Sequence, residues 1–320
     1  MSEVIYIQDP IHAAGVARLV AAGHEIIPPE AGIDDPRLAG ASIYITRTTD
    51  LPEALMACAP GLRLIVKHGA GVDNIDMAGA TRRGIWVANT PGGENSTAVA
   101  EGAVTLMLAV LRRVRDMDAL VRSGRFDERW KVRLGDLTGA RVGFIGFGRI
   151  ARAAAKICGA GFGCEISAYD PMIPPEELRA LGAEPVDLAE LMTRDVISIH
   201  TPLTETTRNL IGAAELARMP PHGVIVNTSR GGIVDETALV AALKAGSIGG
   251  AGIDVLEHEP PAADHPLFAL PNVVLSPHVA GVTEASMKGM AFAVAEVIET
   301  VLAGGRPATL LNSEDRRCPL

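Results

Sequence analysis

Aromatic residues are scarce in this 320-residue chain, which contains only 2 Trp, 3 Tyr and 6 Phe. The hydrophobic core must therefore be built mainly from Ala, Val, Ile and Leu, as it usually is where helices pack on a parallel β-sheet. Charged residues make up 21% and hydrophobic residues 48%, values typical of globular proteins, which exclude extended disorder. A chain of this length is expected to form two domains or one large barrel-type domain.

Positive charge is also in short supply, because 29 Lys and Arg stand against 38 Asp and Glu and the formal net charge is −9. This excess of acidic residues argues against nucleic acid and anionic membranes as partners. The N-terminus lacks a basic segment followed by a long apolar stretch. The longest apolar run, residues 103–111, is about half the ~20 residues that a membrane-spanning helix needs. We therefore expect a cytoplasmic protein.

Cysteine is rare as well, and the four that occur (Cys58, Cys158, Cys164 and Cys318) show no Cys-x-x-Cys spacing. We expect them to be free thiols in a reducing cytoplasm. The eight histidines show no ligand spacing such as His-x-x-x-His. The sequence therefore predicts no metal site.

Short β-branched runs alternate with Ala- and Leu-rich helical stretches, a pattern typical of βα units and a parallel sheet. Strands are expected at residues 4–7, 25–27, 42–45, 64–66 and 85–87, and again at 141–145, 165–169, 196–199, 224–226, 252–254 and 273–275. One long helix is expected over residues 99–122 and another over 283–302. The pattern predicts two α/β halves, with ligands bound near the carboxyl ends of the strands.

A glycine-rich turn between a strand and a helix is the sharpest local signal. Residues 142–151 read VGFIGFGRIA, a buried strand followed by a Gly-x-Gly-x-x-Ala turn and the start of a helical run. Gly146 permits the tight turn, Gly148 lets a pyrophosphate approach the backbone, and the small Ala151 lets the helix pack on the strand. The N–H groups and the positive dipole of the helix N-terminus then face the phosphates.

An acidic residue, Asp170, ends the next expected strand, about 20 residues beyond this turn. A carboxylate there accepts hydrogen bonds from the adenosine ribose hydroxyls and repels a 2′-phosphate. The residues that follow, 171–173 (PMI), carry no positive charge that could compensate. The sequence therefore predicts NAD rather than NADP, the alternative being a helix-packing turn followed by an ordinary surface aspartate.

Polar residues follow three later strands: Arg230, Glu259 and His278. Reduction of a 2-keto acid needs a hydride from a nicotinamide, a proton for the new hydroxyl and a cation for the carboxylate. Histidine suits the proton transfer, a neighbouring carboxylate favours its protonated form and orients the ring, and the planar fork of arginine fits a carboxylate. Each residue alone could be a surface or turn residue, but three at successive strand ends predict a site that reduces keto acids.

Several motifs together are highly specific: residues 146–150 (GFGRI), 200–203 (HTPL), 227–236 (NTSRGGIVDE), 254–255 (DV) with 259–260 (EP), and 276–278 (SPH). Along almost its full length the chain resembles the D-isomer-specific 2-hydroxyacid dehydrogenases. Two departures are small: Ala151 replaces a third glycine, and the loop at 280–283 differs from the common one. Formate dehydrogenases of this superfamily carry glutamine in place of Glu259, and phosphite dehydrogenases carry lysine in place of Ala70.

The resemblance implies a catalytic set in which Arg230 binds the substrate carboxylate, Glu259 supports His278, and His278 donates the proton. It implies an α/β fold of two Rossmann/flavodoxin-like, doubly wound parallel-sheet domains, with the active site in the cleft between them. Residues 1–97 plus 287–320 would form the substrate domain and 98–286 the NAD-binding domain, through which family members usually form homodimers. Contacts with NAD are implied for Gly146, Gly148, Arg149, Ile150, Asp170, Thr201, Thr228, Ser229, Arg230, Asp254 and Gly281.

Residues 67–76 (KHGAGVDNID) resemble the substrate loop of the family, in which the amides of Ala70 and Gly71 would hold the carboxylate as an anion nest. Arg47 and Lys67 end two neighbouring strands, at positions that resemble the basic, phosphate-binding ones of 3-phosphoglycerate dehydrogenases. A third basic cluster lies where those enzymes bring a basic residue from the partner subunit; it consists of Arg129, Lys131 and Arg133.

These charges favour 3-phosphoglycerate and 3-phosphohydroxypyruvate as the substrate pair. Sulfolactate, a 3-sulfonated analogue, would satisfy the same charges. Glyoxylate or hydroxypyruvate would need only Arg230 and the nest, and Arg47 and Lys67 would then be solvated strand-end charges. A different class of function is an NAD-sensing binding protein without enzymatic activity, because transcriptional corepressors share this fold and the triad. Such proteins usually add disordered tails, and this chain offers only residues 312–320.

Overall fold

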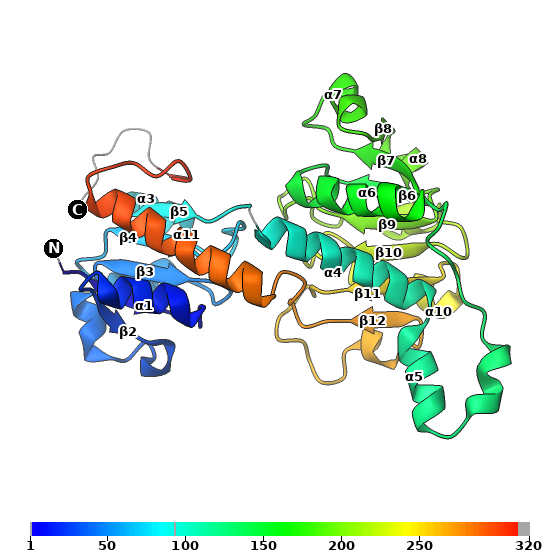
Figure 1. Ribbon diagram of the computed structural model, residues 1–320, viewed down its shortest axis with the longest axis horizontal. Helices are drawn as coiled ribbons and strands as arrows, with labels where there is room; N and C mark the ends of the chain where they lie inside the picture. Colours follow the sequence, from blue (N-terminus) through cyan, green and yellow to red (C-terminus); the bar gives the residue numbers. More distant parts are fainter. Residues whose placement is uncertain (1, 93, 313–320) are drawn as a thin grey trace. The chain divides into compact units, whose positions relative to one another are not determined.

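The computed structural model describes residues 2–92 and 94–312 of the chain. They form two compact units, one with the residues up to Asn95 and those from Val282 onward, the other with Ser96–Gly281. Each unit is a parallel β-sheet covered by helices on both faces (Figure 1). The chain re-enters the first unit before the expected residue 287, because Thr283 already caps the final helix of that unit.

The first unit has a five-stranded sheet in the order β2-β1-β3-β4-β5, the flavodoxin-like order. Its strands are β1 (Val4–Ile7), β2 (Glu25–Ile27), β3 (Ile43–Thr46), β4 (Leu64–Lys67) and β5 (Trp86–Asn89). Its helices are α1 (Ala13–Ala21), α2 (Glu53–Ala57), α3 (Met77–Arg82) and α11 (Glu284–Leu302), with 3-10 turns at Pro29–Ala31 and Pro36–Gly40.

Successive side chains along a strand point to opposite faces of the sheet, so each strand contributes to the core on both faces. Ile5 and Ile7 pack in one cluster with residues of α1 and α11, whereas Tyr6 between them packs with residues of α2 and α3. The ring of Tyr6 meets that of Tyr44 edge to face, with the centroids 5.1 Å apart. Because both faces are buried, these strands are mainly apolar, with polar residues such as Glu25 and Lys67 at their ends, and each fully buried Ile or Leu contributes about 1.5–3 kcal/mol.

The second unit has a seven-stranded parallel sheet in the order β12-β11-β10-β9-β6-β7-β8. Its strands are β6 (Arg141–Ile145), β7 (Glu165–Tyr169), β8 (Glu184–Pro185), β9 (Val196–Ile199), β10 (Val224–Asn227), β11 (Gly250–Ile253) and β12 (Val273–Leu275). Its helices are α4 (Glu94–Leu111), α5 (Val114–Arg122), α6 (Arg149–Phe162), α7 (Pro175–Ala180), α8 (Leu188–Leu191), α9 (Ala213–Leu216) and α10 (Glu236–Ala245), with 3-10 turns at Phe126–Lys131 and Pro266–Ala269. Residues of α4 and α6 cover one face of this sheet, and those of α8, α9 and α10 cover the other.

The single helix expected over residues 99–122 is wrong, because two helices, α4 and α5, occupy this stretch. Arg113 separates them with φ of 47°, a left-handed conformation that a right-handed helix cannot contain. Its guanidinium pairs with Asp116 in the first turn of α5, at 2.6 Å. Neither Gly nor Pro marks this position, so the sequence pattern gave no signal for the break.

The described cysteines, Cys58, Cys158 and Cys164, are free thiols, and Cys318 lies outside the described residues. Burial raises the pKa of the Cys158 thiol to about 12, so this thiol stays protonated at neutral pH. Among the helices that the structure describes, none is both long enough and apolar enough to cross a membrane.

Candidate active site

Arg230, Glu259 and His278 lie together at one edge of the second sheet. They follow β10, β11 and β12, three neighbouring parallel strands whose carboxyl ends share this edge. Nδ1 of His278 lies 2.7 Å from Oε2 of Glu259, and the charge of Arg230 acts on the same carboxylate. The side chains of His278 and Glu259 are 35% and 37% exposed, so a small molecule can reach both.

The environment of Glu259 keeps its carboxylate ionised. Burial by itself raises the pKa of Glu259, but hydrogen bonds from His278 and from the amide of Leu256, with the charge of Arg230, outweigh it. The pKa of Glu259 therefore lies below its usual value. An ionised carboxylate bound to Nδ1 orients the ring of His278.

Asp254 holds the loop that carries His278. The amide of His278 donates to the carbonyl of Asp254 at 2.8 Å, and φ of 56° places His278 in the left-handed region. The buried carboxylate of Asp254 accepts hydrogen bonds from the amides of Val279 and Ala280, at 2.9 and 3.0 Å, and from the hydroxyl of Ser276. The resemblance implied a contact with NAD for Asp254, and in this structure its carboxylate is engaged by the loop.

Asn227, the last residue of β10, shapes the turn that presents Arg230. Its amide nitrogen donates to the carbonyl of Arg230 at 2.8 Å, and its amide oxygen accepts from the backbone N–H of Ser229 at 3.0 Å. Nη1 of Arg230 donates to the carbonyl of Ser229 at 2.8 Å. The Ser229 hydroxyl donates to the carbonyl of Thr201, which brings these two predicted NAD contacts together.

Gly231 lets the Arg230 turn pack directly on the Glu259 loop. A Cβ added at Gly231 would lie 2.0 Å from the carbonyl oxygen of Leu256 and 2.5 Å from the amide of Glu257. Both are backbone atoms, which cannot rotate away as a flexible side chain can. The spacing between Arg230 and Glu259 therefore depends on a glycine at this position.

Gly146 and Gly148 form the tight turn between β6 and α6. Gly146 has φ of 80°, and a Cβ there would lie 2.9 Å from the carbonyl oxygen of His200. Gly148 is the N-cap of α6, and within the described chain no atom lies within 4 Å of the point where its Cβ would stand. Arg149 and Ile150 open α6, and Ala151 is fully buried where the helix packs on the sheet. The turn leaves open space in front of a helix N-terminus.

Asp170 lies beside this turn and accepts hydrogen bonds from the amides of Phe147 at 2.8 Å and Met172 at 2.9 Å. The first bond ties the end of β7 to the turn, so a negative charge stands where the ribose of a dinucleotide would lie. Such a charge disfavours the 2′-phosphate of NADP.

Thr228, directly after β10, has an unsatisfied hydroxyl group. Its hydroxyl oxygen is buried and has no hydrogen-bond partner among the described residues. An unsatisfied buried hydroxyl costs about 1–3 kcal/mol, which a bound ligand can recover. The open space at Gly148 and this buried hydroxyl fit a dinucleotide bound to the second unit.

In the first unit, Arg47 follows β3 and its guanidinium is half-buried. This guanidinium makes no hydrogen bond or ion pair within the part of the chain that the structure describes. Burial lowers the pKa of Arg47, although an arginine stays charged at neutral pH. Next to it, burial and the charge of Arg47 lower the pKa of His68 to about 4, so this imidazole is neutral at pH 7.

Lys67, at the end of β4, is buried and already engaged inside the protein. Its ammonium group donates to the carbonyl of Arg47 and to the side-chain oxygen of Asn74. It thereby joins the loop after β3 to the predicted substrate loop. In this structure the ammonium group of Lys67 links two loops by hydrogen bonds, whereas the sequence predicted a direct contact with a substrate anion.

The predicted nest at Ala70 and Gly71 is held by Asn89, whose amide donates to the carbonyl of Ala70 at 2.7 Å. Within the described residues, the backbone N–H groups of Ala70 and Gly71 donate no hydrogen bond. They are therefore available to an anion, as an anion nest requires.

Asp9 is a residue that the sequence analysis missed. It follows β1, and its buried carboxylate accepts hydrogen bonds from the amides of Arg47, Thr48 and Thr49 at 2.6, 3.1 and 3.3 Å. Burial raises the pKa of Asp9, but these bonds and one from the Thr49 hydroxyl outweigh it and lower the pKa. Asp9 thus fixes the loop that carries Arg47, and its place after a strand was the signal that could have found it.

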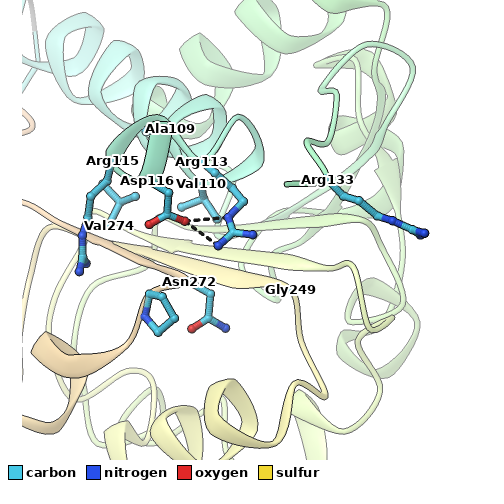
Figure 2. Close-up of a pocket in the computed structure, with 10 residues that line it drawn as sticks. Ala109, Val110, Arg113, Arg115, Asp116, Arg133, Gly249, Asn272 and Val274 are labelled. Carbon is cyan, nitrogen blue, oxygen red and sulfur yellow. Dashed lines mark hydrogen bonds and ion pairs between the residues drawn. The ribbon is translucent and has the colours of Figure 1, made fainter. Parts of the chain in front are cut away.

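A cavity of about 220 Å³ in the second unit lies away from the catalytic set (Figure 2). Gly249 and Asn272, which line it, directly precede β11 and β12, so the cavity lies at the amino ends of these strands. Figure 2 shows the ion pair of Arg113 and Asp116 in its wall and the side chain of Arg133 directed away from it. Within the described ranges, 2–92 and 94–312, no group of three or more His, Cys, Asp or Glu side chains could hold a metal ion.

Comparison with known proteins gives a consistent result. Residues 104–280 match the family model of the NAD-binding domain of D-isomer specific 2-hydroxyacid dehydrogenases. The chain is 42% identical over 294 residues to a glyoxylate reductase from Thermococcus litoralis, covering 89% of this chain and 88% of that protein. It is 40% identical over 264 residues to a D-3-phosphoglycerate dehydrogenase from Archaeoglobus fulgidus, covering 82% of this chain and 50% of that protein.

Among solved structures, an NADPH-dependent glyoxylate/hydroxypyruvate reductase from Sinorhizobium meliloti, in complex with NADP and malonate, matches with a TM-score of 0.86 and 30% identity. The match covers 99% of each chain.

Proposed function

The chain belongs to the D-isomer specific 2-hydroxyacid dehydrogenase family, whose NAD-binding domain it carries, and we propose that its Arg230, Glu259 and His278 interconvert a 2-keto acid and the corresponding 2-hydroxy acid. The hydrogen bond of 2.7 Å between His278 and an ionised Glu259 carries this proposal, because it is the arrangement of an oriented proton donor.

Each of the three side chains has its own task. The guanidinium of Arg230 binds the substrate carboxylate through two parallel hydrogen bonds, and its positive charge polarises the neighbouring carbonyl bond. Because Nδ1 of His278 is bound to Glu259, Nε2 is the nitrogen that gives its proton to the carbonyl oxygen. The ionised Glu259 holds the ring in the orientation from which this proton is transferred. In the oxidative direction the neutral imidazole takes the proton back from the hydroxyl.

The residues that would hold the dinucleotide are the glycine turn, the first turn of α6, Asp170, and the segment that includes Thr228. When NADH is bound, it supplies the hydride that goes to the 2-carbon of the keto acid. The turn at Gly146 and Gly148 provides a close approach for the phosphates, and the N-terminus of α6 stabilises their charge. Asp170 accepts hydrogen bonds from the ribose hydroxyls.

For the substrate we propose a 2-keto acid with a second anionic group, such as 3-phosphohydroxypyruvate, held by Arg47. The half-buried guanidinium of Arg47 lacks a hydrogen-bonding partner within the described chain, and Asp9 fixes its backbone. Sulfopyruvate would offer the same second charge. Glyoxylate or hydroxypyruvate is the second candidate, favoured by the internal engagement of Lys67 and by relatives named glyoxylate reductase.

A substrate panel separates these candidates. We expect NADH oxidation with 3-phosphohydroxypyruvate or sulfopyruvate to exceed that with hydroxypyruvate, glyoxylate and pyruvate by about 10²-fold in kcat/KM, and Arg47→Ala to abolish this preference. The factor corresponds to ~2.7 kcal/mol, a reasonable value for charge-assisted hydrogen bonds. Steady-state rates measured for both proteins check it.

The matched control for this panel is Arg37→Ala, which removes an exposed arginine of the same unit that pairs with Asp35 at 2.7 Å. This variant should keep the preference of the parent protein. A profile led by glyoxylate and unchanged in Arg47→Ala would reject the anionic substrate and leave the protein as a general 2-keto-acid reductase.

We also propose that the protein is a cytoplasmic homodimer that associates through its NAD-binding units. The free thiols support a reducing compartment. The segment from α5 onward exposes apolar side chains, with Val121 61% and Trp130 82% exposed. Arg129 stacks on the ring of Trp130, 4.8 Å from its centroid, and Lys131 lies 3.7 Å from Glu128. A large aromatic group exposed to this degree is typical of a contact surface.

Sedimentation equilibrium tests the dimer. The protein should have twice the mass of the chain, and Trp130→Ser should weaken the association about 10-fold or more, because buried tryptophans are common hot spots of interfaces. Met172→Ser, which removes another apolar side chain that is 87% exposed, is the control and should leave the mass unchanged. A monomer at micromolar concentration would contradict the proposal.

A further inference from the structure

Glu259 lies on a long irregular loop, and this loop needs anchors because its position determines that of the carboxylate. Between the end of β11 at Ile253 and the turn that begins at Pro266, the chain has no regular helix or strand. The amide of Leu256 donates to Oε1 of Glu259 at 2.9 Å, which orients the carboxylate relative to its own loop. Something else must fix the loop relative to the body of the unit.

Glu236, the first residue of α10, contacts this loop at two points. Its Oε1 accepts the backbone N–H of Glu257 at 2.7 Å, two residues before Glu259. Its Oε2 lies 3.0 Å from Nε2 of His265, six residues after Glu259. The side chains of Glu236 and His265 are only 20% and 15% exposed, so solvent screens this contact weakly. One carboxylate thus joins the loop on both sides of Glu259.

The hydrogen bonds of His265 define the direction of this contact. Nδ1 of His265 accepts from the amide of Leu267, at 3.4 Å, at the start of the turn Pro266–Ala269. Nε2 therefore carries the proton and donates it to Glu236. The ring also lies against Phe268, with the centroids 5.4 Å apart, so its orientation is fixed from two sides.

From these contacts we infer that Glu236 is a positioning residue, which holds the loop 255–265 so that the carboxylate of Glu259 meets Nδ1 of His278. Glu236 has no contact with the substrate in this role and acts only through Glu259. The inference rests on the proposed function, because it needs Glu259 and His278 as the working pair. It gives a task to the last residue of the motif at 227–236, which the mechanism leaves unused.

Loss of this anchor should change the catalytic step and leave cofactor binding alone. The charged groups around the pair are Arg230 from the β10 turn, Asp254 at the end of β11, and Glu259 itself. If the loop moves, Glu259 no longer meets Nδ1 of His278, and the ring loses the contact that orients it for proton transfer.

Glu236→Gln tests the inference. Glutamine keeps the size of the side chain, but its single oxygen can accept only one of the two hydrogen bonds, and its amide nitrogen would face the donor of the other. We expect kcat/KM for keto-acid reduction to fall about 10-fold, with the loss in kcat rather than in KM, because Arg230 and its contact with the substrate carboxylate are untouched. The dissociation constant of NADH should stay the same. A crystal structure of the variant should show the distance from Glu259 to His278 lengthened beyond a hydrogen bond.

Glu257→Gln is the matched control, because it makes the same change of charge in the same loop while leaving both contacts of Glu236 in place. The Glu257 carboxylate lies 4.0 Å from Arg208 and is 39% exposed, so kcat and KM should match those of the parent protein. His265→Phe is the second variant, which removes the far contact together with the hydrogen bond that Nδ1 accepts from the amide of Leu267. It should also lengthen the Glu259–His278 distance, and its effect on kcat/KM should be less than additive when combined with Glu236→Gln.

If Glu236→Gln lowers only the melting temperature and leaves kcat and the Glu259–His278 distance unchanged, the residue is merely structural and the inference is rejected. If Glu236→Gln does not fold, His265→Phe decides by the same readouts. Failure of the proposed function would look different, because a variant without His278 would then still turn over. That outcome concerns the assignment of the proton donor, whereas the length of the Glu259–His278 contact in Glu236→Gln concerns the anchor alone.

Discussion

Replacing His278 with asparagine is expected to lower kcat by about 10²–10⁴-fold, the usual contribution of a positioned proton donor. Asparagine suits this test because it tolerates the left-handed backbone, φ of 56°, better than most residues. Its amide can still donate toward Glu259, so the loop held by Asp254 should keep its shape. The asparagine amide has no nitrogen that can give and take a proton as Nε2 of His278 does.

Single-turnover measurement of keto-acid reduction, together with fluorescence titration of NADH, checks this expectation. The rate of keto-acid reduction should fall by this factor, while the dissociation constant of NADH should stay within a factor of about two, since the glycine turn and Asp170 are untouched. His258→Asn, at an exposed position of the Glu259 loop, is the control and should behave as the parent protein. Unchanged turnover in His278→Asn would remove this residue from the mechanism.

Most strands could be predicted from the sequence because an apolar run and the turn that ends it are both local sequence features. Residues 141–145, for example, form an apolar run that a glycine turn closes, and β6 has these bounds in the structure. The proposed catalytic residues Arg230, Glu259 and His278 also follow apolar runs, three, six and three residues beyond the ends of β10, β11 and β12. The all-parallel pairing of both sheets follows from the alternation of strands and helices.

The features that the sequence left open depend on contacts across the fold. The strand expected at 252–254 occupies Gly250–Ile253, and Cβ atoms at Gly250 and Gly252 would lie 2.6 Å from Cγ1 of Val110 and 2.9 Å from Cβ of Leu106. Helix α4 thus packs directly on β11, and glycines that weaken a strand in isolation are favoured by this contact. The internal engagement of Lys67 likewise depends on partners that no local pattern names, whereas the break at Arg113 is accompanied by a local ion pair with Asp116.

Gly231→Ala is the second change with a large expected effect, although it removes no functional group. The added methyl group would lie 2.0 Å from the carbonyl oxygen of Leu256, closer than any real contact, so the two loops must separate. Arg230 and Glu259 lie on these loops, one on each side of the contact. We expect kcat/KM for keto-acid reduction to fall about 10²-fold or more, because a misplacement of 1 Å can have an effect of this size. Unfolding by urea should also show a loss of about 1–3 kcal/mol in stability.

Gly161→Ala is the matched control, because Gly161 lies in α6, is exposed, and has no described atom within 4 Å of its added Cβ. The same substitution there should raise stability by about 0.5–1 kcal/mol and leave the rate unchanged. The effect of Gly231→Ala should fall on kcat/KM for the keto acid more than on NADH binding, since the glycine turn at Gly146 lies on a different loop. If Gly231→Ala kept full activity, the close packing of the Arg230 turn on the Glu259 loop would not be what sets their spacing. The carboxylate of Glu259 would then depend on its anchor at Glu236 alone, and Glu236→Gln would be the more damaging of the two changes.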